Sequence, residues 1–266
     1  MTSQTLYGRK RMRLSILASL LCIASTASAG EGHVVTIHTR LNVSVSYYFL
    51  QSPDATATVV LLPGGEGDIA LDNGAPTSKN FLVRSRDYFA AHALNVAVLD
   101  RPSDRTEMGY VYRVSNEHIE DMRKIVVHLK KVTRLPVWLV GTSRGTISAA
   151  AAAIAFGSDE LAGIVLTSSV TDRKKTGAVP SQSLRKIRIP VLVLHHTYDA
   201  CKICSPGDAS DIIHGLTNAP VKKLILVQGG GNPTDDPCGP LHWHGYVGME
   251  KEAVNIIAGW IAHPVP

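Results

Sequence analysis

The sequence has little net charge once its first residues are set aside. It contains 27 basic and 22 acidic residues, a formal charge of +5. Residues 1–29 hold four of the basic residues and none of the acidic ones, which leaves 23 basic and 22 acidic residues in the remainder. A body this close to neutral lacks the broad basic surface that a binder of the phosphate backbone needs. We therefore expect no nucleic-acid partner.

The chain also lacks long apolar runs, internal repeats, low-complexity tracts and linkers. A membrane-spanning helix needs about 20 consecutive apolar residues, and no run after residue 29 is long enough. The hydrophobic content of 45% is too high for a disordered protein. These absences indicate a single folded domain that does not insert stably into a membrane.

The first 29 residues have the layout of a secretory signal peptide. A basic segment at 1–13 precedes a short apolar run at 14–24, and Ala27-Ser28-Ala29 matches the small-x-small cleavage pattern. The apolar run is 11 residues long, which is too short for the alternative of a membrane anchor. We expect a signal peptide over residues 1–29, one domain over residues 30–266, and a secreted or periplasmic protein of a bacterial cell.

The remaining sequence alternates between strand-like and helix-like segments. Two alternating β-branched runs predict a hairpin, and six short apolar runs predict buried strands at residues 58–62, 95–99, 136–140, 161–166, 190–194 and 223–228. Helices are predicted at residues 78–93, 115–129, 145–156 and 249–260, with a short one opening at Ser205-Pro206. This alternation indicates an α/β fold with a mostly parallel central sheet and helices on both faces.

Gly141, Ser143 and Gly145 form a Gly-x-Ser-x-Gly pattern between a predicted buried strand and a predicted helix. A serine hydroxyl is a weak nucleophile unless it is exposed and its proton can be accepted. A sharp strand-to-helix turn exposes the serine, and the glycines let the two backbones pass closely. The helix N-terminus places backbone N–H groups where negative charge develops. The pattern favours a nucleophile at Ser143 over a purely structural turn.

Two further polar segments follow predicted strands. Asp199 lies just past the strand at 190–194, where functional groups gather in open α/β sheets, although an aspartate there can also simply cap a turn. A long glycine-rich loop follows the last strand and carries His242 and His244. Loops of this length are either disordered or functional, and two histidines in one loop favour function. Asp235 and Asp236 on the same loop are alternative acids.

With the chain order Ser143, Asp199, His244, the sequence resembles the α/β-hydrolase superfamily over nearly all of residues 30–266. The likeness is closest to small secreted bacterial serine hydrolases without a developed cap, and it implies an α/β-hydrolase fold. It also implies that Ser143 is the nucleophile, His244 the general base and then acid, and Asp199 its orienting carboxylate. His244 is preferred to His242 because members of the superfamily commonly place a glycine after the base, as Gly245 is here.

The resemblance also implies an oxyanion hole and an open site. One donor is the backbone N–H of Arg144, and the other comes from the turn at 63–67, with Gly65 preferred and Glu66 as the alternative. Cap domains of this superfamily are inserted between the strands that end near 169 and begin near 190. Only about 20 residues lie there, so no large cap domain is expected. This connector, 170–189, carries a local charge of +5, typical of a solvated loop or of a rim for acidic substrates.

Three cysteines remain after Cys22 of the predicted leader, so at most one internal disulfide can form. We expect it between Cys201 and Cys238, where it ties the loop of Asp199 to the loop of His244. Cys201-x-x-Cys204 is alternatively a redox motif. A zinc site is a further alternative, and its candidate ligands are His195, His196, Cys201, Cys204, His242 and His244. We expect neither a metal nor another cofactor.

The residues together predict a secreted serine hydrolase that cleaves a carboxylic ester through an acyl-enzyme intermediate. The alternatives are a serine peptidase or amidase of the same fold and a binding protein that has lost turnover. The expected partner is a small ester or peptide substrate. The identity of that substrate and the oligomeric state do not follow from the sequence.

Overall fold

The computed structural model describes residues 1–2, 31–234 and 236–266. The predicted signal peptide lies almost entirely outside the described residues, and so does Asp235. Within the described part of the chain, no helix is both long and apolar enough to cross a membrane.

Eight strands form one sheet in the order β1-β2-β6-β3-β7-β8-β9-β10. The first two pairings, β1 with β2 and β2 with β6, are antiparallel, and all the others are parallel. The strands are β1 His33–Arg40, β2 Val43–Leu50, β3 Ala57–Leu62, β6 Leu94–Pro102, β7 Val137–Thr142, β8 Gly163–Thr167, β9 Val191–His196 and β10 Lys222–Val227. The predicted mostly parallel sheet is confirmed.

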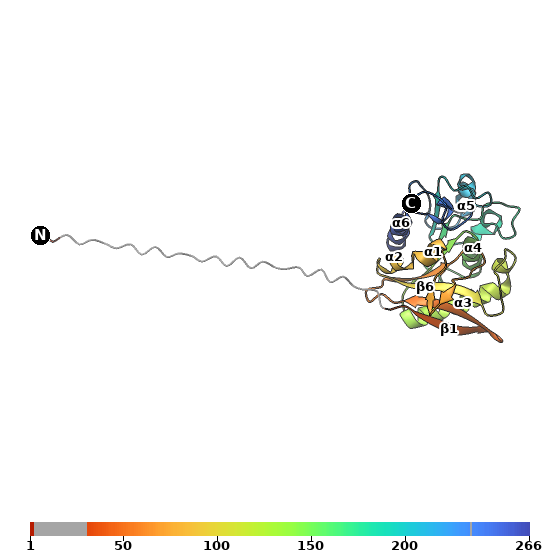
Figure 1. Cartoon of the computed structure of the whole chain (residues 1–266), viewed down its shortest axis with the longest axis horizontal. Helices are drawn as coiled ribbons and strands as arrows, with labels where there is room; N and C mark the ends of the chain where they lie inside the picture. Colours follow the sequence, from red (N-terminus) through yellow and green to blue (C-terminus); the bar gives the residue numbers. More distant parts are fainter. Residues whose placement is uncertain (3–30, 235) are drawn as a thin grey trace.

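Helices cover both faces of this sheet (Figure 1). They are α1 Phe81–Arg84, α2 Arg86–Ala90, α3 Asn116–Thr133, α4 Gly145–Ala155, α5 Ala209–Gly215 and α6 Glu250–Ala262. Residues of α3, α4 and α5 pack in one hydrophobic core and residues of α1, α2 and α6 in a second, with sheet residues in both. Each core is therefore one helix layer packed against one side of the sheet.

Burial along the strands follows their apolar patterns. Every residue of β3, β7, β8 and β9 is buried, as expected for central parallel strands with helices above and below them. β1, at one edge, alternates between exposed and less exposed residues. β10, at the other edge, is mostly half-buried.

The predicted helix over 78–93 is wrong in one respect, because the structure contains two short helices there. α1 ends at Arg84, and the next residue, Ser85, has ψ near 3° before α2 begins at Arg86. The backbone N–H of Ser85 closes the first helix on the carbonyl of Phe81. A small hairpin, β4 Leu71–Asp72 with β5 Ala75–Pro76, precedes them and was not predicted.

The 170–189 connector contains only two short 3₁₀ turns, η2 Val179–Ser181 and η3 Leu184–Lys186. Val179, Leu184 and Ile187 are buried in the same core as α4 and α5. The connector therefore packs onto the domain and forms no separate cap, as predicted.

The parallel direction of β3, β7, β9 and β10 brings their carboxyl ends to one edge of the sheet. The segments that follow them are the glycine turn at 63–67, the serine turn at 143, the Asp199 loop and the histidine loop. Gly64 and His244, for example, lie 180 positions apart in the chain and are assembled at one end of the domain.

Gly145 packs so closely that a side chain has no room. A Cβ at this position would lie 2.0 Å from the carbonyl oxygen of Leu62. We predict that Gly145→Ala lowers the free energy of unfolding by about 1–3 kcal/mol, because backbone atoms must move apart. The matched control is Gly259→Ala in α6, where a Cβ meets nothing within 4 Å. This control should raise stability by about 0.5–1 kcal/mol. Urea unfolding measures both, and equal effects would contradict the packing argument.

Candidate active site

Ser143 occupies the sharp turn between β7 and α4. Its φ is +51°, a left-handed conformation that non-glycine residues rarely adopt, and such strain is common where a side chain must be presented. Its backbone N–H donates to the carbonyl of Thr167 at 3.0 Å, and its carbonyl accepts from the backbone and side chain of Thr146 at 2.9 and 2.6 Å. These bonds hold the strained residue, whose half-buried side chain lines a cavity of about 220 Å³.

Asp199 and His244 meet at the edge of the same cavity. Asp199 follows β9, and His244 lies in the 3₁₀ turn η5 Trp243–Gly245 of the loop after β10. The Nδ1 atom of His244 donates to Oδ2 of Asp199 at 2.8 Å, and both residues are buried. This bond places the proton on Nδ1 and leaves Nε2 as an acceptor. The Nε2 atom has no hydrogen-bond partner among the described residues.

The structure distinguishes the two candidate histidines. His242 is half-buried, packs edge-on against Trp243, and makes no described hydrogen bond to Asp199. The second oxygen of Asp199 accepts from the backbone N–H of Cys201 at 2.9 Å. The carboxylate is therefore fixed in its own loop and directed at His244. Asp236, one of the alternative acids, is exposed, and its Oδ1 accepts from the backbone of Cys238.

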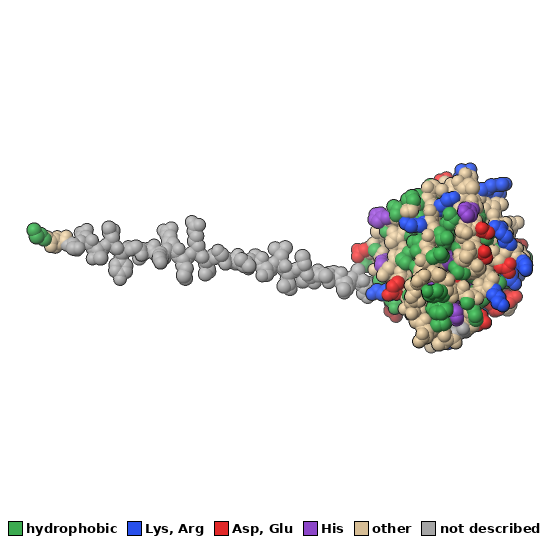
Figure 2. Space-filling view, turned by 90° about the horizontal axis from the view of Figure 1, so that it is seen from above, with side chains coloured by type: hydrophobic (Ala, Val, Ile, Leu, Met, Phe, Trp, Pro, Cys, Tyr) green, Lys and Arg blue, Asp and Glu red, His purple; other side chains and the backbone are tan. Residues whose placement is uncertain are grey.

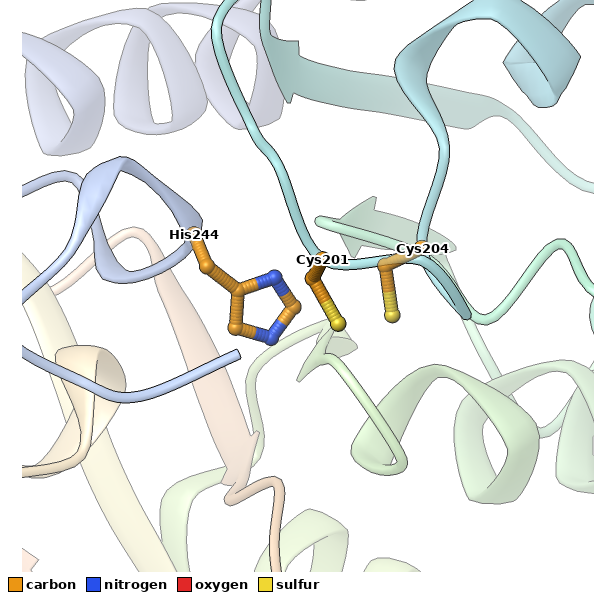
Figure 3. A group of neighbouring side chains, drawn as sticks. All are labelled: Cys201, Cys204 and His244. Carbon is orange, nitrogen blue, oxygen red and sulfur yellow. The ribbon is translucent and has the colours of Figure 1, made fainter. Parts of the chain in front are cut away.

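Cys201 and Cys238 are joined by a disulfide, which links the loop of Asp199 to the loop of His244. Cys204 is the free, buried thiol. Its ligand atom lies within 4.8 Å of those of Cys201 and His244, and Figure 3 shows the imidazole ring directed toward the loop that carries both cysteines. In the disulfide form, Cys201 offers no thiolate to a metal. His195, His196 and His242 are not part of this cluster.

The Cys204 thiol and the Ser143 hydroxyl are close neighbours. Burial raises the pKa of the Cys204 thiol, and a hydrogen bond with the Ser143 side chain offsets part of that shift. Within the described residues, no hydrogen bond joins Ser143 to Nε2 of His244. Such bonds are often long or poorly aligned in active sites without substrate.

The histidine loop is held by its backbone carbonyls. Ser168 donates its hydroxyl proton to the carbonyl of His244 at 2.8 Å. The Nη2 atom of Arg84 donates to the carbonyl of Gly245 at 2.6 Å and to Glu250 at 2.9 Å. Two elements distant in sequence thus fix the position of the imidazole. The sequence pattern gave no signal for either contact.

The glycine turn after β3 lies beside Ser143. Gly65 and Gly67 have positive φ values of 57° and 82°, and Gly67 donates its backbone N–H to the carbonyl of Gly64. The backbone N–H groups of Gly65, Glu66 and Arg144 make no hydrogen bonds within the described residues. All three, including both alternatives for the second oxyanion donor, remain available to a ligand. Gly65 and Glu66 line the cavity together with Ser143.

Arg113 supports this turn from beneath and is 1% exposed. It donates to the carbonyls of Pro63 and Gly65, both at 3.2 Å, to the carbonyl of Met108 at 3.0 Å, and to the hydroxyl of Ser148 at 3.1 Å. It makes no ion pair within the described part of the chain, and burial lowers its pKa to about 9. The sequence alone left Arg113 unassigned, because nothing local shows that it lies under residues 63–65.

The basic connector does not line the cavity beside Ser143. Lys174 and Lys175 instead border a separate cavity of about 840 Å³, which both acidic and basic side chains line. Arg173 pairs with Asp211 at 3.1 Å. Figure 2 shows Lys and Arg side chains interspersed with Asp and Glu side chains on one face of the molecule. These positions favour the interpretation of the connector as a solvated loop.

Similar proteins were found among solved structures only. No family model and no curated protein matches the chain. It is similar to a dienelactone hydrolase from Anabaena variabilis, with 14% identity, coverage of 90% of this chain and 100% of that chain, and a TM-score of 0.63. An esterase from Pyrococcus furiosus shares 13% identity, with coverage of 87% and 90% and a TM-score of 0.62.

A further neighbour is an α/β serine hydrolase without a lid from Xanthomonas campestris. It shares 15% identity, the match covers 88% of this chain and 93% of that chain, and the TM-score is 0.58. Identities this low show the fold alone. The chain therefore has the α/β-hydrolase fold, and the resemblance predicted from the sequence is confirmed at that level.

We predict that breaking the disulfide weakens both the fold and the site. Cys238→Ser should lower the free energy of unfolding by about 2–4 kcal/mol, because the unfolded chain loses a cross-link. It should also lower the rate at which Ser143 reacts with a serine-directed probe about tenfold or more, because the two loops no longer hold Asp199 against His244. Chemical reduction of the wild type should reproduce both effects. Lys202→Ala, at an exposed position of the same loop, keeps the disulfide and is the control. Full reactivity after complete reduction, verified by thiol titration, would contradict this role.

Two buried histidines make the fold sensitive to acid. Burial lowers the pKa of His118 to about 3 and that of His195 to about 4. Both stay neutral in the folded protein, whereas the unfolded chain takes up their protons below about pH 6.5. The unfolded state binds more protons in this window, so the free energy of unfolding falls by about 1.4 kcal/mol per pH unit for each histidine as the pH drops from 6.5 toward 4.

Urea unfolding between pH 7 and pH 4.5 tests this dependence. His118→Gln should reduce the slope of unfolding free energy against pH by about 1.4 kcal/mol per unit. His38→Gln, at an exposed position of β1, should leave the slope unchanged. Identical slopes for the wild type and His118→Gln would show that His118 is not neutral in the fold.

Proposed function

We propose that this protein is a serine hydrolase that cleaves the carboxylic ester of a small substrate through an acyl-enzyme intermediate. The observation that carries the proposal is the arrangement of His244. Its Nδ1 is hydrogen-bonded to the buried Asp199 at 2.8 Å. Its Nε2 has no hydrogen-bond partner among the described residues, and His244 lines the same cavity as Ser143. An imidazole oriented in this way by a carboxylate is the general base that a serine nucleophile requires.

The reaction follows from these positions. Nε2 of His244 accepts the hydroxyl proton as Oγ of Ser143 attacks the ester carbonyl carbon. The carbonyl oxygen becomes an oxyanion and accepts hydrogen bonds from the backbone N–H of Arg144 and of Gly65 or Glu66. The protonated His244 then gives its proton to the leaving alkoxide. Water, deprotonated by the same imidazole, attacks the acyl carbon and releases the acid and the free Ser143.

The dimensions of the site support a small substrate. The cavity beside Ser143 has a volume of about 220 Å³, below the roughly 300–1,000 Å³ of drug-sized ligand sites. Within the described residues, no cap domain extends over it. The solved neighbours with the same fold include a dienelactone hydrolase and an esterase. These features favour an ester of a small acid or alcohol over a long-chain lipid. The second candidate is cleavage of an amide or peptide, for which the same three residues suffice.

We also propose that the protein acts outside the cytoplasm, after removal of residues 1–29. The disulfide between Cys201 and Cys238 supports this location, because structural disulfides persist mainly in oxidising compartments. Cys238 is exposed, so a reducing environment would have access to the bond.

A fluorophosphonate probe and short-chain p-nitrophenyl esters test the proposed function. The wild type should be labelled at Ser143 and should hydrolyse the esters. Ser143→Ala should lose labelling, and Ser143→Ala and His244→Gln should each lower kcat by about 10³-fold or more, because these residues act as a unit. His242→Gln is the matched control and should retain labelling and most of the activity. A wild type that is neither labelled nor active, or labelling that survives Ser143→Ala, would refute the function.

A further inference from the structure

Asn80 is a polar residue of the cavity that the triad does not use. It directly precedes α1, and its side-chain Oδ1 accepts a hydrogen bond from the backbone N–H of Leu82 at 3.1 Å. This bond is an N-cap, which satisfies one of the free N–H groups of the short helix. It also fixes the orientation of the amide, because only the oxygen can accept from Leu82. The Nδ2 group is therefore directed away from the helix.

The Nδ2 group lies beside the nucleophile. A Cβ built on Gly64 would lie 2.8 Å from Cβ of Ser143 and 3.5 Å from Nδ2 of Asn80. The amide and the serine thus flank the space that the missing side chain of Gly64 leaves open. Asn80, Gly64, Ser143 and His244 all line the same cavity. Within the described residues, Nδ2 of Asn80 makes no hydrogen bond.

The position of α1 is itself fixed relative to the histidine loop. Arg84, at its last turn, donates to the carbonyl of Gly245, directly after the base, and to Glu250 in α6. Phe81, at its first turn, packs on the ring of Tyr246 with 4.7 Å between the ring centroids. Asn80 is therefore carried by an element that is locked to the catalytic loop, which is what a preorganised donor requires.

From this arrangement we propose that Asn80 is a third donor of the oxyanion hole, which rests on the proposed serine hydrolase function. Its Nδ2–H donates to the substrate carbonyl oxygen as that oxygen becomes the tetrahedral oxyanion, alongside the backbone N–H of Arg144 and of Gly65 or Glu66. The amide forms and breaks a hydrogen bond only, and no proton leaves it. The hydrogen bond strengthens as negative charge develops on the oxygen, so it stabilises the transition state more than the bound ester.

Variants that retain the helix cap distinguish an oxyanion donor from a purely structural residue, and steady-state kinetics provides the measurement. Serine is as good an N-cap as asparagine but carries no donor that reaches the position of Nδ2. Asn80→Ser should lower kcat for a p-nitrophenyl ester about 100-fold, the effect typical of removing one oxyanion donor, with KM changed less than about threefold. Its thermal midpoint should stay within about 2 °C of the wild type. Asn80→Asp, which places an oxygen at the donor position, should lower kcat at least as much.

A transition-state analogue provides a second readout. A boronic acid that forms a tetrahedral adduct with Ser143 should bind Asn80→Ser weaker by about the same factor as the loss in kcat/KM. Asn116→Ser, at the exposed first residue of α3, is the surface control and should match the wild type in every measurement.

The outcomes distinguish this proposal from the proposed function. Suppose that the wild type is labelled by the fluorophosphonate and hydrolyses esters, but Asn80→Ser keeps kcat within about threefold of the wild-type value. Asn80 then only caps α1, and this proposal is overturned while the proposed function stands. If Asn80→Ala loses thermal stability while Asn80→Ser keeps full activity, the same conclusion follows. A wild type that neither labels with a fluorophosphonate nor hydrolyses any ester overturns both. The proposal is supported by a loss in kcat and in boronate binding with an unchanged thermal midpoint.

Discussion

The hydrogen bond between Nδ1 of His244 and the carboxylate of Asp199 is the interaction on which the rest of the site depends. It selects the tautomer in which Nε2 accepts a proton, and it fixes the plane of the ring. The two residues lie 45 positions apart on loops that follow different strands. Their contact exists because parallel strands end at one edge of the sheet and because the Cys201–Cys238 disulfide joins the loops within a few residues of the pair.

Two groups near the carboxyl ends of the parallel strands are individually unfavourable for folding. Ser143 has a strained left-handed backbone, and Arg113 is a buried guanidinium without an ion-pair partner among the described residues. Burying an unpaired cation costs several kcal/mol, and the lowering of the pKa of Arg113 to about 9 is a consequence of that cost. Four hydrogen bonds to carbonyl and hydroxyl oxygens offset part of it. The turn at 63–67 is held in place by these bonds, and within the described residues the backbone N–H groups of Gly65 and Glu66 stay free for a ligand.

The sequence predicted the features that have a local signature. Unbroken apolar runs indicated the buried strands, and the glycines around Ser143 indicated the strand-to-helix turn. Order along the chain then indicated Asp199 and His244. The sequence did not predict the contacts of Arg113 or the orientation of Asn80. Arg113 reaches its acceptors across 48 and 50 positions, and no periodicity records which side chain lies beneath a distant turn. The break at Ser85 was missed because the helical pattern continues through it.

A crystal structure of the protein after reaction with a fluorophosphonate would show which groups act together in the site. We expect phosphorus bonded to Oγ of Ser143 and the phosphonyl oxygen within about 3.1 Å of the backbone nitrogen of Arg144 and of that of Gly65 or Glu66. His244 should face the adduct with its bond to Asp199 intact. A phosphonate on another residue, or an adduct that faces His242 while the Asp199–His244 bond is absent, would contradict this expectation.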